Sequence, residues 1–164
     1  MNEKTVIRVG MAELKIATSP HILRTSGLGS CVGMALYDAS ERIGGMVHIM
    51  LPTSKIARET DPNPAKYADL AVPKLMDELI KFGAKPSKIK AKLAGGAQMF
   101  AFKSESEMIK IGLRNVEMCH NLLKQMSIPI EGEDVGGNSG RTIELHMDTG
   151  KLTISTANKL IKEL

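Results

Sequence analysis

The fold is decided by residues 31–51, CVGMALYDASERIGGMVHIML. From 32 to 37 the larger apolar side chains alternate with smaller or polar ones, and a period of two is typical of a β-strand. Residues 38–41 are polar and predict a turn, after which residues 46–51 resume the β pattern. The segment therefore predicts an antiparallel β-hairpin.

The turn length decides which residues of this hairpin face one another. If residues 38–41 form a four-residue loop, Tyr37 pairs with Arg42 and Cys31 stands opposite His48. Opposed side chains on one face lie about 4.5–5.5 Å apart at Cβ. A slip of one residue sends the two side chains to opposite faces, so the pairing depends on this loop length. We therefore expect a thiol beside an imidazole.

A thiol beside an imidazole is the arrangement of a cysteine nucleophile and its general base. The imidazole of His48 would remove the thiol proton and leave a nucleophilic thiolate on Cys31. Such a pair generally needs a third group that orients the imidazole. Thr25 is the candidate, because it ends the preceding predicted strand and no Asp or Glu lies between His21 and Val32.

Gly27, Gly29 and Ser30 lie just before the cysteine and predict a loop in which the backbone approaches a substrate closely. Backbone N–H groups there, including that of Cys31, can stabilise the oxyanion that forms when an amide carbonyl is attacked. One such donor contributes about 3 kcal/mol in comparable enzymes. We expect these three residues to bind the substrate.

Each of these residues also has a structural interpretation. A free cysteine in a strand is usually a small buried hydrophobe, and a glycine-rich turn is often only a turn. Residues 27–30 can be read as a phosphate cradle, although they lack the Walker and dinucleotide-binding glycine spacings. Cys119 is interpreted as core, and the remaining histidines as surface or structural residues: His21, His120 and His146.

Two main helices are predicted. The first begins with Asn63 as N-cap and ends at Gly83, with a kink at the internal Pro73. The second covers about 115–126 and turns an apolar stripe inward.

Further strands and loops surround these helices. Strands are predicted at 6–9, 13–17, 22–25, 89–93 and 128–133, and a second hairpin joins 143–147 to 152–154. Irregular or flexible segments are predicted at 97–111 and 136–140, with a frayed helical tail at 157–164.

These elements predict an α/β layered sandwich with a mixed, largely antiparallel β-sheet and two main helices. Hairpins are antiparallel, whereas a doubly wound fold needs crossovers between most strands. The 164 residues suit a single domain, 1–164, that buries a substantial core.

Composition narrows the function classes. With no Trp, two Tyr and three Phe, the chain lacks stacking platforms, so we expect no nucleic-acid partner. The net charge of +4 is scattered, and suits either solubility or an acidic protein partner. Residues 1–9 hold no apolar run for a signal peptide or membrane span, which predicts a cytoplasmic protein. The two cysteines, without a C-x-x-C pair, predict free thiols, and we expect neither a metal nor a cofactor.

Several motifs, in this order along the chain, resemble one known family. They are TSGLGSCV at 25–32, VHIMLP at 47–52, KYAD at 66–69, KLAGGAQMF at 92–100, IG at 111–112, RNVE at 114–117, ED at 133–134 and GGNSGR at 136–141. The set resembles the CheD family of chemoreceptor glutamine deamidases over about residues 5–155. One departure is Val135, where the family pattern leads us to expect Thr.

The resemblance implies a Cys-His-Thr site that falls on Cys31, His48 and Thr25. In the family, the thiolate attacks a receptor glutamine amide, ammonia leaves from a covalent thioester, and water then yields glutamate. Some members also hydrolyse receptor methyl esters. The implied fold is an α/β sandwich similar to that of deamidating toxins of the cytotoxic necrotizing factor type.

The family resemblance also implies protein partners. These are the cytoplasmic domains of chemotaxis receptors and the CheC phosphatase, which competes with receptors for the active-site face and is itself stimulated. An alternative to the enzyme is therefore a binding module that acts mainly by stimulating CheC, with minor catalysis. Filled positions at Cys31, His48 and Thr25 favour the enzyme.

Overall fold

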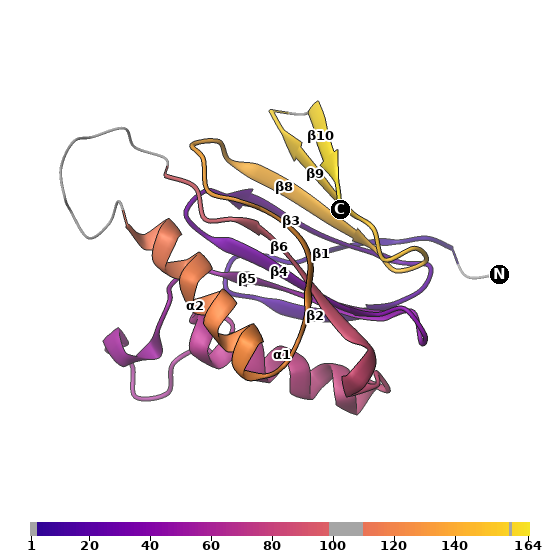
Figure 1. Ribbon diagram of the computed structural model, residues 1–164, viewed down its shortest axis with the longest axis horizontal. Helices are drawn as coiled ribbons and strands as arrows, with labels where there is room; N and C mark the ends of the chain where they lie inside the picture. The colour runs from indigo at the N-terminus through magenta and orange to yellow at the C-terminus, as the bar shows by residue number, and fades with distance from the viewer. Residues whose placement is uncertain (1–2, 99–109, 158) are drawn as a thin grey trace.

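The computed structural model describes residues 3–98, 110–157 and 159–164. Within these ranges the strands form two five-stranded sheets, which stack on one another, and two α-helices cover the free face of one sheet (Figure 1). We call the sheet against the helices the middle sheet and the other the outer sheet. The expected α/β layered sandwich is confirmed, and its strands divide into two sheets.

The middle sheet carries the hairpin predicted from residues 31–51. In spatial order it contains β2 (Leu14–Thr18), β5 (Ile43–Ile49), β4 (Val32–Asp38), β6 (Ile89–Gly95) and β7 (Ile130–Val135). Only the β6–β7 pair of this sheet is parallel. β4 therefore lies at the centre, hydrogen-bonded on both sides.

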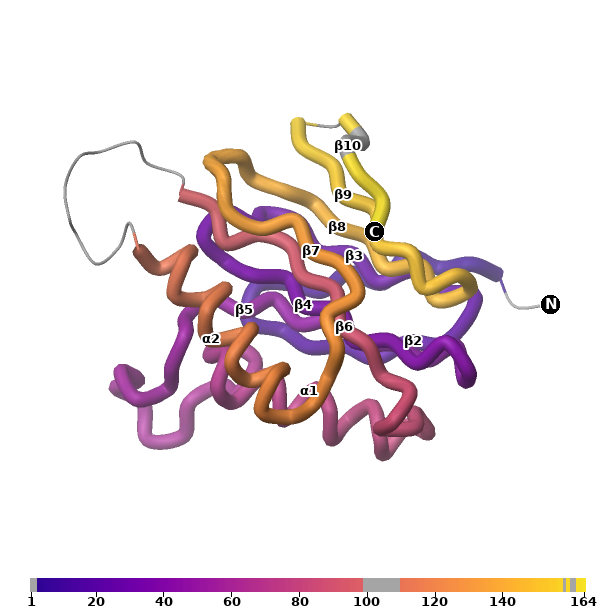
Figure 2. The backbone as a smooth tube through the Cα atoms, viewed as in Figure 1, coloured from indigo at the N-terminus to yellow at the C-terminus, as the bar shows by residue number. Residues whose placement is uncertain are grey.

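The outer sheet carries the second predicted hairpin. Its order is β1 (Val6–Arg8), β3 (Ile22–Leu28), β8 (Arg141–His146), β9 (Leu152–Thr156) and β10 (Lys159–Glu163). β1 and β3 run parallel, and the other pairs are antiparallel. The tube in Figure 2 follows the chain as it passes between the two sheets.

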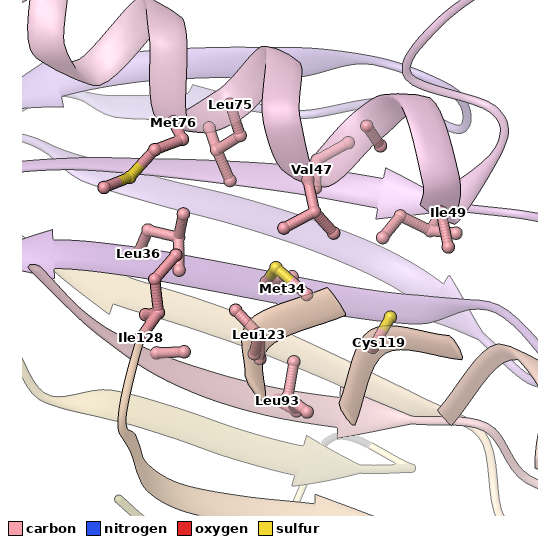
Figure 3. Packing of buried hydrophobic residues seen from close by; sticks show 14 of the residues in the cluster. Met34, Leu36, Val47, Ile49, Leu75, Met76, Leu93, Cys119, Leu123 and Ile128 are labelled. Carbon is pink, nitrogen blue, oxygen red and sulfur yellow. The ribbon is translucent and has the colours of Figure 1, made fainter. Parts of the chain in front are cut away.

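The helices α1 (Ala68–Phe82) and α2 (Ile111–Gln125) pack on the middle sheet. Met34 and Leu36 of β4 point toward Leu75 of α1 and Leu123 of α2 in this layer (Figure 3). The alternate residues of the segment, including Cys31 and Ala35, belong to a second apolar cluster between the two sheets. The predicted alternation of β4 is thus confirmed, and it sorts the side chains into two cores.

The predicted hairpin register is wrong by two residues. Asp38 ends β4 and pairs with Ile43, so the turn covers residues 39–42 and His48 stands opposite Gly33 instead of Cys31. The carboxylate of Asp38 accepts hydrogen bonds from the backbone of Ser40 and Glu41 and from the Ser40 hydroxyl. Asp38 therefore caps the turn from the last strand position, as Asp commonly does at the first residue of a turn.

The first helix begins later than predicted. Asn63 does not cap α1, because its side-chain oxygen accepts from the N–H of Ala65 in a turn before the helix. α1 starts at Ala68 and ends, as predicted, at Gly83, whose φ is 117°. Pro73 lies inside α1, and a kink there stays a prediction.

Two other predictions are wrong, and a third is largely untested. Residues 159–163 form β10 and not a helical tail, because they pair with β9 along the edge of the outer sheet. α2 begins at Ile111, four residues before the predicted 115. Most of the predicted loop at 97–111 lies outside the described residues.

The described helices include none with the length and apolarity needed to cross a lipid bilayer.

Candidate active site

The two-residue register error leaves Cys31 and His48 on the same face. Side chains along a strand alternate, so the position opposite His48, Gly33, shares a face with Cys31 two residues earlier. Cys31 and His48 are therefore diagonal neighbours, and such positions lie about 7–8 Å apart. Both side chains point from the middle sheet toward the outer sheet, where Cys31 belongs to the same buried cluster as Leu28 and Ile143.

Thr25 meets His48 from the opposite sheet. The Thr25 hydroxyl oxygen lies 2.7 Å from His48 Nδ1, in a hydrogen bond between β3 of the outer sheet and β5 of the middle sheet. Both side chains are almost completely buried. The imidazole is thus held at one nitrogen, and the role of Thr25 as an orienting group stays a prediction.

A β-bulge in β3 places Thr25 for this contact. Along the β3–β8 pair, Thr25 stands opposite Ile143 and Leu28 stands opposite Arg141, so β3 has one residue more than β8. Gly27 adopts a φ of 72°, which a glycine reaches without steric cost. The extra residue lets Thr25 and Leu28 both point inward although they are three positions apart. The predicted loop is corrected accordingly, because Gly27 belongs to the strand.

The second nitrogen of the His48 ring is left unengaged. Nε2 is buried and has no hydrogen-bond partner among the described residues, so the structure contains no thiol–imidazole hydrogen bond from Cys31. Burial lowers the pKa of His48. Burial also raises the pKa of Cys31, and this effect is larger than the lowering that comes from a hydrogen bond with the backbone N–H of Cys31 itself. Desolvation disfavours both charged forms, so burial favours a neutral thiol and a neutral imidazole over a thiolate–imidazolium pair.

The chain around Cys31 is fixed through its carbonyl groups. The N–H of Ala97 donates to the carbonyl of Gly29 at 2.8 Å, and the N–H of Gly96 donates to that of Cys31 at 2.8 Å. The carbonyl of Ser30 accepts from Asn115 Nδ2 at 2.9 Å. Three consecutive carbonyls are therefore held by the two residues that follow β6 and by α2. Gly29 and Ser30 lie beside the thiol as predicted, and their role toward a substrate stays a prediction.

Gly95 at the end of β6 allows this close approach. Its φ is 109°, and a Cβ at this position would collide with the carbonyl oxygen of Cys31. The residue also accepts a hydrogen bond from the buried Arg141, whose NH1 lies 3.2 Å from the Gly95 carbonyl. Arg141 further binds the carboxylate of Asp134 and the carbonyl of Gly136, and so joins the ends of β6, β7 and β8.

Sequence reasoning did not assign a role to Gly95, Asn115 or Arg141. All three lie in the motifs that carry the family resemblance, and this was the available signal. Val135, the departure from the pattern, pairs with Gly95 and lines a cavity of about 220 Å³ beside Gly96. The departure therefore changes a cavity wall next to the site.

The other cysteine and the other histidines lie away from this site. Cys119 is completely buried in the layer between helices and middle sheet, where burial raises its pKa to about 12 (Figure 3). His21 accepts a hydrogen bond from the N–H of Thr5, and His120 lies 2.6 Å from the carboxylate of Glu133. The described part of the chain contains no group of three or more His, Cys, Asp or Glu side chains that could hold a metal ion.

Comparison with known proteins identifies the family. The family model described as CheD chemotactic sensory transduction matches residues 50–156, more than half of the 164 residues. The chain belongs to the CheD family. The matched range begins after Thr25, Cys31 and His48, so their roles stay predictions.

Full-length relatives agree with membership of the CheD family. The chain is 51% identical over 159 residues to the chemoreceptor glutamine deamidase CheD of Halalkalibacterium halodurans. The aligned residues cover 97% of this chain and 98% of that relative. Identity to the chemoreceptor glutamine deamidase CheD of Bacillus subtilis is 49% over 157 residues, 96% of this chain and 95% of that one. A probable chemoreceptor glutamine deamidase CheD of Geobacillus kaustophilus is 48% identical over 165 residues, with both chains covered completely.

Substituting Gly95 tests the close approach to Cys31. Gly95→Ala should lower the free energy of unfolding by more than Gly83→Ala, in urea titrations followed by circular dichroism. Both glycines have a φ above 100°, but a Cβ at Gly83 would meet only Ile43 Cδ1, at 3.5 Å. The control therefore carries backbone strain alone, about 1–3 kcal/mol. Equal losses in the two variants would contradict the close packing of Gly95 on Cys31.

The rate of thiol alkylation tests the neutral resting pair. At about pH 8, iodoacetamide should modify Cys31 more slowly than a free thiol, because only the thiolate reacts and burial raises the pKa of Cys31. The rate should still rise above about pH 8.5, the ordinary thiol pKa. Cys119, with an exposed fraction of 0% against 9% for Cys31, should stay unmodified in the folded protein. A rate that levels off near neutral pH would instead indicate a resting thiolate–imidazolium pair.

Proposed function

We propose that this chain hydrolyses glutamine side-chain amides to glutamate on chemotaxis receptors, with Cys31 as nucleophile and His48 as general base. One observation carries the proposal. The imidazole of His48 is held at Nδ1 by Thr25, while Nε2 stays free on the face of the middle sheet that carries the thiol. The names of the full-length relatives supply the substrate, because they are chemoreceptor glutamine deamidases.

Catalysis needs the tautomer with the proton on Nδ1, and the Thr25 hydroxyl can accept a hydrogen bond from that N–H group. If Nδ1 carries the proton and donates it to the Thr25 hydroxyl, Nε2 is unprotonated and can accept the thiol proton. An imidazole without such a partner divides its proton between the two nitrogens. Thr25 thus takes the place that a carboxylate occupies in a Ser-His-Asp triad. A neutral hydroxyl suits this buried position, since it adds no charge between the sheets.

The first half of the proposed reaction forms a thioester. His48 Nε2 takes the thiol proton as the sulfur of Cys31 bonds to the carboxamide carbon, and the carbonyl oxygen becomes an oxyanion. In the proposed reaction the backbone N–H groups of Ser30 and Cys31 stabilise this charge, because the N–H of Gly29 already donates to the Gly27 carbonyl at 3.1 Å. The three held carbonyls fix the positions of these donors. The imidazolium then gives its proton to the departing nitrogen, and ammonia leaves.

The second half releases glutamate. Water loses a proton to His48, attacks the thioester carbon, and displaces the thiol of Cys31, which regains its proton. A methyl ester would pass through the same thioester with methanol as the leaving group, so receptor methylesterase activity is a side reaction that this chemistry allows. We place this reaction in the cytoplasm, on the cytoplasmic domains of the receptors.

Reaction requires the thiol and Nε2 to meet. Cys31 and His48 are diagonal neighbours without a hydrogen bond between them in the resting protein, and the side chains of Leu28 and Ile143 lie over Gly33 on the same face. The proposed reaction therefore requires the cysteine side chain to move toward Nε2 of His48. Excluding water with a bound substrate strengthens the interaction of the charges that then develop.

Replacing the thiol tests the proposed nucleophile. Cys31→Ala should abolish ammonia release from a receptor cytoplasmic fragment, and mass spectrometry should find its glutamines unchanged. Cys119→Ala is the matched control, because it removes a thiol that lies in the other core. It should retain deamidation at temperatures where it stays folded. Undiminished deamidation by Cys31→Ala would rule out the mechanism.

The same variant separates catalysis from binding of a CheC phosphatase, which the family resemblance implies. Binding requires a surface and no thiol, so Cys31→Ala should still bind and stimulate CheC if the chain acts as a regulatory module.

A further inference from the structure

We propose that Asn115 of α2 is a positioning residue, whose amide group ties the chain before the nucleophile to the chain after the general base. Its Nδ2 donates to the carbonyl of Ser30 at 2.9 Å and to the carbonyl of Met50 at 3.1 Å. Ser30 precedes Cys31, and Met50 follows His48 by two residues. The inference rests on the proposed function, because it assigns a role in that reaction.

The side-chain amide of Asn115 lies where the backbone hydrogen bonds between β4 and β5 end. Val32 and Ile49 are the last paired residues, and the extension of their register would place Cys31 opposite Met50. At that point both strands turn to other partners. The N–H of Met50 donates to the Lys66 carbonyl, and the Cys31 carbonyl accepts from the N–H of Gly96. Asn115 therefore bridges the two chains just beyond the end of the ladder.

The geometry requires an amide of this length. The two N–H bonds of one nitrogen serve two carbonyl oxygens, which would otherwise face each other without a donor between them. Asn115 is completely buried, so water does not replace it. Its Oδ1 has no hydrogen-bond partner within the described ranges, which means that the side chain is retained at an energetic cost.

The bridge acts on the relative position of thiol and imidazole. The proposed nucleophile and base lie on two neighbouring strand segments. The side-chain amide of Asn115 donates one hydrogen bond to the end of each segment. Loss of the amide should loosen the approach of the Cys31 sulfur to His48 Nε2. A misplacement of about 1 Å costs on the order of 100-fold in rate. We expect this loss in kcat and not in KM, because Asn115 is buried and does not contact the substrate.

The first test measures kinetics on a receptor fragment. Asn115→Ala should lower kcat by about 10- to 100-fold while KM changes by less than about twofold. Asn121→Ala, at an exposed position of the same helix, and Leu123→Ala, at a core position of the same helix, are the controls. Leu123→Ala loses stability without losing the bridge, so it should keep its kcat below its melting temperature. An unchanged kcat in folded Asn115→Ala would overturn the inference.

A nearly isosteric variant gives a readout that packing alone would not change. In Asn115→Asp, the protonated acid can still donate one hydrogen bond, whereas the carboxylate repels both carbonyls. Its activity should fall as the pH rises through the carboxyl pKa, on a limb that wild type and Asn115→Ala lack. The other ionisable groups nearby, Cys31, His48, Arg114 and Cys119, are common to all three proteins. If the pH–activity profile of Asn115→Asp runs parallel to that of the wild type, the inference is overturned. This test does not depend on whether Asn115→Ala folds.

Alkylation of Cys31 separates this inference from the proposed function. Absence of ammonia release in the wild type would refute the deamidase proposal alone. The Asn115 bridge would then be tested by the rate at which iodoacetamide alkylates Cys31. A changed rate in Asn115→Asp would support the bridge, and a rate equal to that of the wild type would refute it.

Discussion

The hydrogen bond between the Thr25 hydroxyl and His48 Nδ1 is the contact on which the proposed chemistry depends. It joins β3 of the outer sheet to β5 of the middle sheet, beside a large apolar cluster between the two sheets. A buried polar pair in such a layer requires both partners, because either one alone would be left desolvated and unpaired. The sheet stacking, the bulge at Gly27 and the orientation of the imidazole are therefore parts of one arrangement. The same arrangement leaves Nε2 of His48 without a hydrogen-bond partner among the described residues.

The alternation of residues 31–51 predicted the strands and, more usefully, the face of each side chain. The register was wrong because Asp38 looks like a turn residue but ends β4, with its carboxylate capping the turn and accepting from the N–H of Lys85. Arg42, the last residue of that turn, adopts a positive φ of 53° that no pattern predicts. Cys31 and His48 nevertheless share a face, since a shift of two residues preserves the parity of a strand.

Features that arise from distant contacts could not be predicted from local patterns. Asn115 reaches Ser30 across 85 positions of the sequence, and a buried asparagine on a helix reads as an ordinary polar residue until the fold places it. β10 illustrates the same limit, because pairing with β9 overrides a helical preference at residues 159–163. The contact between Thr25 and His48 could be anticipated, because an imidazole base needs an orienting group and few candidates were near in the sequence. This is a chemical argument that does not depend on the register, and the catalytic role of Thr25 stays a prediction.

The tautomer of His48 is the most direct test of the account. In protein labelled with ¹⁵N-histidine at neutral pH, the ring nitrogen shifts of His48 should show a protonated Nδ1 and an unprotonated Nε2. Thr25→Val, which removes the hydroxyl and keeps the shape, should weaken this preference. A wild-type ring that carries its proton on Nε2 could not accept one from Cys31, and would contradict the role assigned to the Thr25 contact.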